Sequence, residues 1–286
     1  MASNKKIKKL KYALRFLPDK AYLQIYYFLK FKKFINFKNP KTFNEKLNYL
    51  KLYDRNPLYT ILVDKYEVKE YVGRIIGEEY IIPTLGVWDK FDDIDFEKLP
   101  NQFVLKCTHD SQGLVIVKDK SEFDIEQARK KIEESMKYNF YYIGREWPYK
   151  NVKPRIIAEE YMGENLNDYK FFCFNGVPKI VLLCSNRIGN MKNTNFYDDE
   201  WKLLPFTRKK HVNNMDKIKK PLKLNEMLKN CRVLAKNIPF VRIDLYFINN
   251  KVYFGECTFY PSAGMEGFSP TIWDNRLGDM IKLDNN

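Results

Sequence analysis

Histidine and cysteine are scarce in this sequence. Among its 286 residues there are 2 histidines and 5 cysteines, and no two cysteines form a CxxC pair. Zinc sites and histidine-dependent catalytic triads need several such side chains close together, so we expect neither. The odd number and scattered positions of the cysteines indicate reduced, buried thiols, as is typical of a cytoplasmic protein.

Several diagnostic motifs are also missing. No apolar run reaches the roughly 18 residues that a transmembrane helix needs. Arg15, Asp19 and Lys20 interrupt any apolar core of a secretory signal. There is no GxSxG, HExxH, GxGxxG or Walker P-loop motif, which argues against the enzyme classes that depend on them. The DxD motif of many metal-dependent glycosyltransferases is absent as well, and the nearest acidic cluster is at 198–200.

Positive charge is concentrated at the N-terminus. The net charge is +14, and residues 1–38 hold eleven Lys/Arg and one Asp, so +10 of it lies there. Two runs on either side of Pro18-Asp19 have apolar residues at helical spacing, which predicts two basic amphipathic helices. The spaced positions are Leu10, Ala13, Leu14 and Leu17, then Tyr22, Ile25, Tyr26 and Leu29. Such helices suit an anionic membrane surface or an acidic polymer, and the alternative is a helical hairpin packed on the protein body. No nucleic-acid-binding motif accompanies the charge.

The order of helix and strand patterns indicates an α+β fold. Thr42-x-x-Glu45 is a capping box that begins a helix, and residues 58–77 form another helix ended by Gly77. Helices are also predicted over 122–137 and 222–237. Strands are predicted over 85–88, 103–107, 114–117, 156–161, 169–175 and 178–184, the last two joined by a turn at Asn175-Gly176.

The most informative stretch is a predicted hairpin over residues 241–259 (VRIDLYFINNKVYFGECTF). Apolar and polar residues alternate on both sides of Asn249-Asn250, so one face lies in a core and the other carries Asp244 and Glu256. A strict two-residue turn would put these carboxylates on opposite faces, whereas a three-residue loop or a bulge puts them side by side, as the alternation favours. At about 4 Å they would repel by roughly 4 kcal/mol at an effective dielectric of 20, and a divalent cation turns that cost into binding. Oxygen-only ligands suit Mg²⁺ bridging to phosphates, and the alternative is a solvated acidic face.

Two other segments are suited to contact a nucleotide. Lys106 leaves the strand 103–107, and the loop after it holds Ser111, Gln112 and Gly113. A lysine and the backbone N–H groups of a small loop can reach phosphate oxygens, although an ordinary polar hairpin loop has the same composition.

The second such segment ends the strand 156–161 with four consecutive residues, Glu159, Glu160, Tyr161 and Met162. Such an edge can present backbone groups to an adenine and a carboxylate to a ribose. A solvated strand end is the alternative.

Three further positions are candidates for substrate contact or catalysis. Arg145 lies in the loop GREWP, where its guanidinium could recognise a substrate carboxylate. Ser262 and Gly264 follow the carboxylate hairpin and are placed to contact the group being phosphorylated. Lys170 lies on the polar side of its strand. A lysine in such a place more often extends its charged end to solvent than takes part in catalysis.

Taken in order, these segments resemble the TupA-like ATP-grasp family of bacterial surface-polysaccharide gene clusters. The resemblance runs from about Pro18 and is carried by NPKTFNEKLNYLKLYDRNPLYTILVDKYEVKEYV, FVLKCTHDSQG, GREWPYKNVKPRIIAEEYM, DYKFFCFNG and VRIDLYFINNKVYFGECTF. It implies an ATP-grasp fold, in which two α+β subdomains hold ATP between antiparallel sheets. Four parts are expected: 1–57, a basic helical region; 58–98, a helix and strand segment; 99–162, the central subdomain; and 163–286, the C-terminal subdomain with the metal site.

The resemblance also implies roles for individual residues. It matches Lys65 and Lys106 to phosphate-binding lysines, and Asp244 and Glu256 to Mg²⁺ ligands. Many ATP-grasp enzymes have Asn where this chain has Thr258, so that ligand is a departure. The implied nucleotide contacts are Lys65, Lys106, Ser111, Gln112, Gly113, Glu159, Glu160, Tyr161, Met162 and Asp168; the metal ligands are Asp244, Glu256 and Thr258; and the catalytic residues are Arg242 and Lys170.

The implied activity is that of an ATP-dependent carboxylate–amine ligase that works through an acyl phosphate, with ATP and Mg²⁺ as cofactors. The implied partners are an acidic sugar of a capsular or other surface polysaccharide, or its lipid-linked precursor, and an amino acid or other amine. A glycosyltransferase or sugar kinase of the same biosynthesis is the alternative. The expected location is the cytoplasm, peripheral at the inner face of the membrane through residues 1–38.

Overall fold

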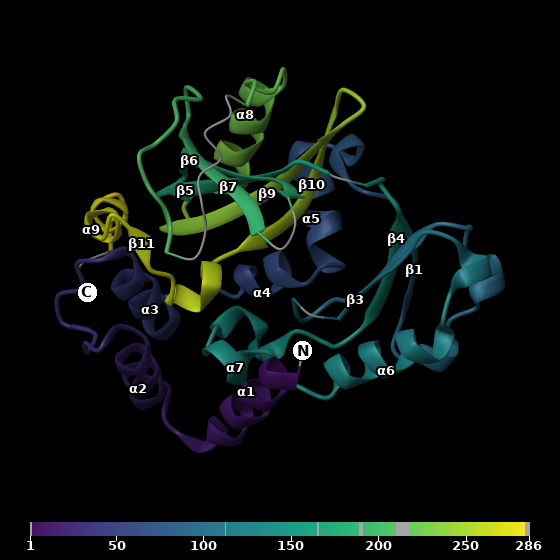
Figure 1. Ribbon diagram of the computed structural model, residues 1–286, viewed down its shortest axis with the longest axis horizontal. Coiled ribbons are helices and arrows are strands. Elements are labelled where there is room, and N and C mark those ends of the chain that lie inside the picture. Colours follow the sequence, from purple (N-terminus) through teal and green to yellow (C-terminus); the bar gives the residue numbers. More distant parts are fainter. Residues whose placement is uncertain (1, 112, 165, 189–190, 210–217, 284–286) are drawn as a thin grey trace. The chain divides into compact units, whose positions relative to one another are not determined.

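The computed structural model describes residues 2–111, 113–164, 166–188, 191–209 and 218–283. Its contacts divide the chain into two compact units, whose helices and strands are labelled in Figure 1. Unit 1 comprises Met1–Pro18, Arg55–Tyr71 and Ile81–Gly163, and unit 2 comprises Asp19–Asp54, Val72–Tyr80 and Glu164–Asn286. Both mix helices with antiparallel sheet, which confirms the predicted α+β class. In the described ranges no helix is both long and apolar enough to cross a membrane.

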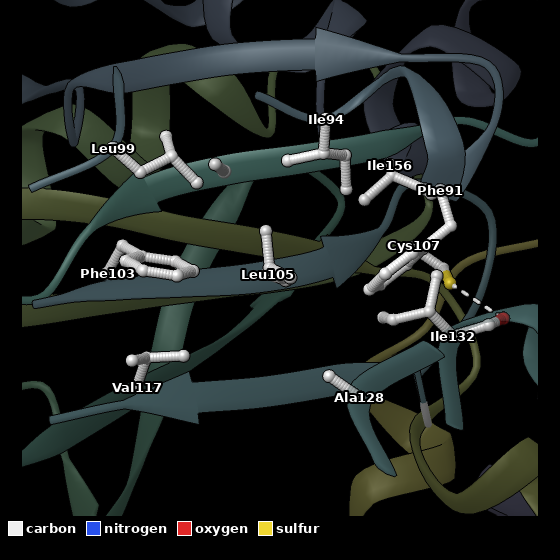
Figure 2. Packing of buried hydrophobic residues seen from close by; sticks show 11 residues of the cluster. Phe91, Ile94, Leu99, Phe103, Leu105, Cys107, Val117, Ala128, Ile132 and Ile156 are labelled. Carbon is white, nitrogen blue, oxygen red and sulfur yellow. Dashed lines mark hydrogen bonds between the residues drawn. The ribbon is translucent and has the colours of Figure 1, made fainter. Parts of the chain in front are cut away.

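Unit 1 is built on a four-stranded antiparallel sheet in the order β1-β4-β2-β3. The strands are β1 (Thr84–Trp88), β2 (Phe103–Cys107), β3 (Leu114–Val117) and β4 (Ile156–Glu160). Helix α6 (Ile125–Met136) packs on β2 and β3. Figure 2 shows the core between them, where Phe103, Leu105 and Cys107 point to the side that holds Ala128 and Ile132 of α6. The intervening residues of β2 therefore face the opposite side of the sheet.

The N-terminal segment packs on unit 1 through a face that its apolar spacing did not predict. Helix α1 (Ala2–Ala13) and the 3-10 turn η1 (Leu14–Phe16) lie against α7 (Tyr141–Gly144). The Tyr12 ring meets Tyr138 and Tyr142 edge-on, with centroids 5.1 and 5.8 Å apart. Leu10 is 64% exposed although it belongs to the predicted apolar row. The apolar row of α1 therefore faces solvent.

The predicted helix over 58–77 is wrong in one respect, because the chain forms two helices there. They are α4 (Leu58–Val63) and α5 (Glu67–Ile76). The Asp64 carboxylate accepts the N–H groups of Tyr66 at 2.9 Å and Glu67 at 3.3 Å, which caps α5 and interrupts the helical hydrogen bonds. Gly77, with φ of +121°, ends α5 as expected.

Unit 2 is built on a five-stranded antiparallel sheet in the order β10-β9-β5-β6-β7. The strands are β5 (Asp168–Phe174), β6 (Val177–Ile188), β7 (Met191–Asp198), β9 (Phe240–Ile248) and β10 (Lys251–Thr258). A two-stranded ribbon pairs β8 (Thr207–Arg208) with β11 (Phe268–Ser269). The helices of this unit are α2 (Asp19–Phe31), α3 (Phe43–Tyr53), α8 (Leu224–Leu234) and α9 (Ile272–Asp279).

Helix α8 packs on β5 and β6, while α3 packs against α9. The predicted capping box of α3 is confirmed, because Thr42 and Glu45 each accept the other's backbone N–H. In α2, Tyr22 is buried, but Ile25 and Leu29 of the same predicted apolar row are 46% and 64% exposed. That row therefore only partly faces the body of unit 2.

The register of the carboxylate hairpin combines a tight turn with a bulge. Asn249 and Asn250 have φ of 48° and 60°, as a two-residue hairpin turn requires. A register shift at Gly255 then brings Glu256 opposite Asp244. A Cβ atom on Gly255 would lie 3.0 Å from the Asp244 carbonyl oxygen, a tight contact that favours glycine at the bulge. The prediction that a bulge or longer loop sets the carboxylates side by side is confirmed.

Candidate functional site

One face of the unit 2 sheet carries a group of charged residues that we call the carboxylate cluster. The register places Lys170 opposite Asp244, Asp244 opposite Glu256, and Arg242 opposite Thr258. Directly opposed residues share a face, and so do residues two apart on one strand. The members of the cluster are Asp168, Lys170, Arg242, Asp244, Glu256 and Thr258.

Arg242 holds the centre of the carboxylate cluster. Its Nε and Nη2 donate to the two Asp244 carboxylate oxygens at 2.6 and 2.7 Å, a bidentate pair. Its Nη2 also donates to Glu256 Oε1 and Thr258 Oγ1, both at 3.0 Å. Burial would lower the pKa of Arg242, but Asp244 and Glu256 outweigh it and raise that pKa. The guanidinium is therefore a fixed positive charge.

Lys170 and Asp168 extend the carboxylate cluster along β5. The Lys170 ammonium bonds to Asp168 at 2.5 Å and also to Asp244. Burial raises the pKa of Asp168 to about 6, and the neighbouring Asp244 charge adds to the effect. Burial would lower the pKa of Lys170, but Asp244 reverses the direction and raises it.

The donor set of the carboxylate cluster fits magnesium. Among the described residues, no group of three or more His, Cys, Asp or Glu side chains could hold a metal ion. Mg²⁺ does not need such a cage, because it usually takes one or two carboxylates together with waters and substrate phosphates. Asp244 and Glu256 offer oxygen only, and Asp168 Oδ1 is buried with no hydrogen-bond partner within the described ranges. A buried carboxylate oxygen without a hydrogen-bond partner favours a cation nearby.

A second charged group lies on the unit 1 sheet, on the face opposite the core of Figure 2. Glu159 on β4 binds the ammonium groups of Lys106 on β2 and of Lys69 on α5, the latter at 2.6 Å. Burial would raise the pKa of Glu159, but the two lysines outweigh it and lower that pKa. We call these three residues the lysine cluster. Sequence reasoning missed Lys69, whose one signal is its place four residues after Lys65 in VDKYEVKEYV.

The loop between β2 and β3 is held from within unit 1. Lys65 donates its ammonium to the Asp110 carbonyl and its N–H to the Thr108 carbonyl. The Asp110 carboxylate accepts the Gly113 N–H at 3.0 Å and the Ser135 hydroxyl. A Cβ atom on Gly113 would lie 2.3 Å from Cys107 Sγ, so the loop depends on glycine there for packing. Lys65 and Gly113, both predicted phosphate contacts, thus meet at this loop.

The other predicted nucleotide contacts of unit 1 differ in their exposure. Ser111 and Glu160 are exposed, and Tyr161 and Met162 are half-buried after the end of β4. Glu159 is instead engaged by the lysine cluster. Gln112 lies outside the described residues.

Arg145 is not placed as a surface contact in this structure. It is 2% exposed, and its Nη2 donates to the carbonyls of Leu14 and Leu17 at 2.9 and 3.1 Å. Its guanidinium also lies over the rings of Tyr141 and Tyr142. This geometry fastens η1 to α7, which gives Arg145 a structural role within unit 1.

The loop holding Ser262 and Gly264 has an unusual backbone. Ser262, Ala263 and Gly264 have φ of 51°, 55° and 60° in the turn η7 (Pro261–Gly264). Two buried side chains of α3 hold this turn: Lys51 donates to the Ala263 carbonyl at 2.7 Å, and Asn48 donates to the Gly264 carbonyl at 2.9 Å. Left-handed residues outside glycine cluster at ligand-binding sites, where the surrounding structure maintains the strain.

Comparison with known proteins finds a matching family and several similar solved structures. The model of the family described as TupA-like ATPgrasp matches residues 45–282. No curated protein matches the chain. Among solved structures, the D-alanine–D-alanine ligase of Helicobacter pylori is 17% identical with a TM-score of 0.45, covering 84% of this chain and 69% of that one. The ATP complex of the D-alanine–D-alanine ligase of Bacillus anthracis is 18% identical with a TM-score of 0.47, covering 77% and 65%.

A third similar structure is the L-amino acid ligase of Bacillus licheniformis. It is 14% identical with a TM-score of 0.48, and the match covers 87% of this chain but 57% of that one. The chain therefore spans between about half and two thirds of the length of these three ligases.

Proposed function

Because this chain belongs to the TupA-like ATP-grasp family, we propose that it is an ATP-dependent ligase that joins a carboxylate to an amine. The observation that carries this proposal is the pairing of Asp244 with Glu256 on one sheet face, with Arg242 and Lys170 beside them. Paired carboxylates next to fixed cations suit a metal-bound polyphosphate.

Asp244 and Glu256 would hold Mg²⁺, with the Thr258 hydroxyl as a further oxygen donor. When bound, the ion would neutralise phosphate charge. Asp168, at the start of β5, would lie beside the nucleotide. Arg242 would stabilise the negative charge that develops on the transferred group, because Asp244 and Glu256 raise its pKa against the effect of burial and keep it charged.

The phosphates of ATP would bind the lysine side of unit 1. Lys65 and Lys106 each have three N–H donors, so an ammonium already bonded to the protein retains donors for phosphate oxygens. Ser111, Gln112 and Gly113 belong to the loop that would cover these phosphates. Glu160, Tyr161 and Met162 follow β4 and would contact adenine and ribose, while Glu159 keeps Lys106 in place.

The reaction we propose has two steps. A substrate carboxylate oxygen attacks the γ-phosphorus of ATP, the bond from that phosphorus to the bridging oxygen breaks, and ADP leaves. The amine nitrogen then attacks the acyl carbon of the acyl phosphate. The bond from that carbon to the phosphate oxygen breaks, inorganic phosphate leaves, and the amine gives up a proton as the amide forms. Positioning and charge neutralisation supply the catalysis.

The acidic substrate would be a sugar of a surface polysaccharide or its lipid-linked precursor, and the amine an amino acid or similar compound. The basic N-terminal region supports an anionic partner, because residues 1–38 carry +10 of the net charge. Ile7, Leu10 and Phe16 on α1 and η1 are 48%, 64% and 79% exposed. Exposed apolar residues among lysines are typical of a segment that lies on an anionic membrane surface.

Substitution of the paired carboxylates tests the ligase proposal. Asp244→Asn and Glu256→Gln are expected to lower ADP release by about 10²-fold or more, because metal charge stabilisation contributes several kcal/mol. The assay follows ADP release that requires both a carboxylate and an amine, together with Mg²⁺-dependent binding of a non-hydrolysable ATP analogue. Glu200→Gln, at an exposed acid of unit 2, is the matched control. Near-normal analogue binding in both variants would refute the metal assignment.

The membrane proposal has its own test. Replacement of both Leu10 and Phe16 by serine should weaken sedimentation with vesicles that contain phosphatidylglycerol, while ADP release is retained. Leu222→Ser serves as the control, because Leu222 is 87% exposed and lies in unit 2. Equal sedimentation of the double variant and the control at low ionic strength would rule out this surface.

A further inference from the structure

Arg208, at the end of β8, is half-buried, and unlike Arg155 and Arg242 it has no carboxylate bonded to it among the described residues. Its Nε is enclosed by protein and has no hydrogen-bond partner among the residues that the structure describes. No ion pair to its guanidinium occurs in that part of the chain either. Burial lowers the pKa of Arg208, and the charge of Glu266 offsets this effect only in part. Its charge is thus partly removed from water without a carboxylate bonded to it among the described residues.

The usual arrangement is seen at two other arginines. Arg242 bonds to Asp244 and Glu256. Arg155 bonds to Asp64 at 2.8 Å and to Glu67 at 2.7 Å. Guanidinium groups enclosed by protein are normally paired with carboxylates in this way, so one that lacks such a pair requires an explanation.

The surroundings of Arg208 belong to the proposed site. It lies opposite Phe268 in the β8–β11 ribbon, and the next residue, Lys209, donates its N–H to the Gly267 carbonyl at 2.8 Å. The ribbon thus joins β8 to the end of the 261–266 loop that holds Ser262. The groups that act electrostatically on Arg208 are Glu266, Arg242, Cys184 and Asp244. Arg208 therefore lies within electrostatic range of the carboxylate cluster, on a strand that pairs with the segment after the candidate substrate loop.

We propose that Arg208 binds the carboxylate group of the acidic substrate. This inference rests on the ligase function proposed above and names the contact that would select an acidic substrate over a neutral one. A planar guanidinium matches a carboxylate through two parallel N–H donors, and a phosphate oxyanion through the same donors. We assign the carboxylate because Arg242 and Lys170 already place two cations at the carboxylate cluster, where the proposed metal and the phosphates would bind.

The first test requires no ligand. An arginine retained for a ligand is a liability in the ligand-free protein, so Arg208→Met should raise Tm by about 2–4 °C. Lys209→Met, at the exposed neighbour, should leave Tm unchanged. A lower Tm in Arg208→Met would make the guanidinium a structural element and would overturn the proposal.

The second test uses simple anions as probes at constant ionic strength. D-Glucuronate, at high millimolar concentration, should raise the Tm of the wild-type protein and of Lys209→Met. It should have no effect on Arg208→Met, and the neutral sugar D-glucose should have none on any variant. Equal shifts in Arg208→Met and the wild type, or no shift in the wild type, would overturn the assignment. A shift given by inorganic phosphate alone, and lost in Arg208→Met, would assign Arg208 to the nucleotide instead and would also overturn it.

A third measurement separates this proposal from the ligase proposal. Arg208→Met should retain Mg²⁺-dependent binding of a non-hydrolysable ATP analogue, whereas Asp244→Asn should lose it. Loss of analogue binding in Arg208→Met would contradict the carboxylate role. Loss of the anion effect alone leaves the nucleotide site intact and supports that role.

Discussion

Removal of the negative charge of Glu159 should destabilise unit 1 strongly. Glu159 is the one acid of the lysine cluster, and its side chain is 6% exposed. At a separation of 2.6 Å, the Coulomb attraction between Glu159 and Lys69 is about 6 kcal/mol at an effective dielectric of 20, before the desolvation cost is subtracted. Desolvation offsets most of that gain while the pair is intact. Glu159→Gln leaves Lys69 and Lys106, 12% and 25% exposed, without their carboxylate. Loss of one partner of a buried pair costs about 3–5 kcal/mol.

Hydrogen exchange measured by mass spectrometry reports the loss of stability separately for unit 1 and unit 2. A loss of 3–5 kcal/mol corresponds to about 10²–10³-fold faster exchange in peptides from β2 and β4, where opening is global for unit 1. Peptides from β5 and β9 in unit 2 serve as the internal reference. Glu160→Gln is the matched control, because Glu160 is the exposed neighbour. Exchange in β2 and β4 that stays within a few-fold of the wild type would refute the charge argument.

The difference in stability between the wild type and Glu159→Gln should depend on pH. The lysines lower the pKa of folded Glu159 below its ordinary value of 4.5. A lowered folded-state pKa means that the stabilisation is fully present above pH 4.5 and is lost as pH falls through the folded pKa. The difference between wild type and Glu159→Gln should therefore be constant from neutral pH down to about 5 and should shrink in more acidic buffer. A difference that grows on acidification would contradict the assignment.

Three further predictions concern unit 2. Gly278→Ala should lower the free energy of unfolding of unit 2 by about 1–3 kcal/mol or more, because the new Cβ would lie 2.2 Å from the Lys41 carbonyl oxygen. Urea unfolding measures this loss, and an unchanged midpoint urea concentration would contradict the prediction. Burial raises the pKa of Asp274 from 3.8 to about 6, so its stabilisation is present below pH 3.8 and is lost as pH rises through 6. The stability of the wild type relative to Asp274→Asn should therefore fall by up to about 3 kcal/mol between pH 4 and 7, and a pH-independent difference would refute this. Gly255→Val should raise the Mg²⁺ concentration needed for half-maximal ADP release, because the valine side chain would push β10 away from the Asp244 carbonyl. An unchanged Mg²⁺ dependence would show that the bulge accommodates valine and would refute this prediction.

Much of the fold follows from patterns that span only a few residues. The hairpin at Asn175-Gly176, the capping box of α3 and the strands β2 to β5 lie where periodicity and turn chemistry predict them. The family was also predictable, and the match over residues 45–282 confirms it. Sequence reasoning placed no strand at β7, β8 or β11. Two of these, β8 and β11, are two residues long and pair only with each other, so no periodic pattern marks them.

The helix over 58–77 shows where local reasoning fails. The predicted helix runs through Asp64, but the carboxylate of Asp64 caps α5 and binds Arg155 far along the chain. The apolar row of α1 fails for a related reason, because Tyr12 packs on the body while Leu10 faces outward. In both cases a contact with a distant segment overrides the local preference.

The sequence by itself determined which chemical groups the chain offers and on which strands they lie, because side-chain alternation is a property of each strand alone. It placed Asp244 and Glu256 on one polar face and predicted that an irregularity must align them. Only the tertiary structure decided that the bulge falls at Gly255, that Lys69 shares Glu159 with Lys106, and that Arg208 is half-buried with no bonded acid among the described residues. These features depend on register and burial, and the ion pairs of Glu159 join residues that are tens of positions apart, so no local pattern encodes them.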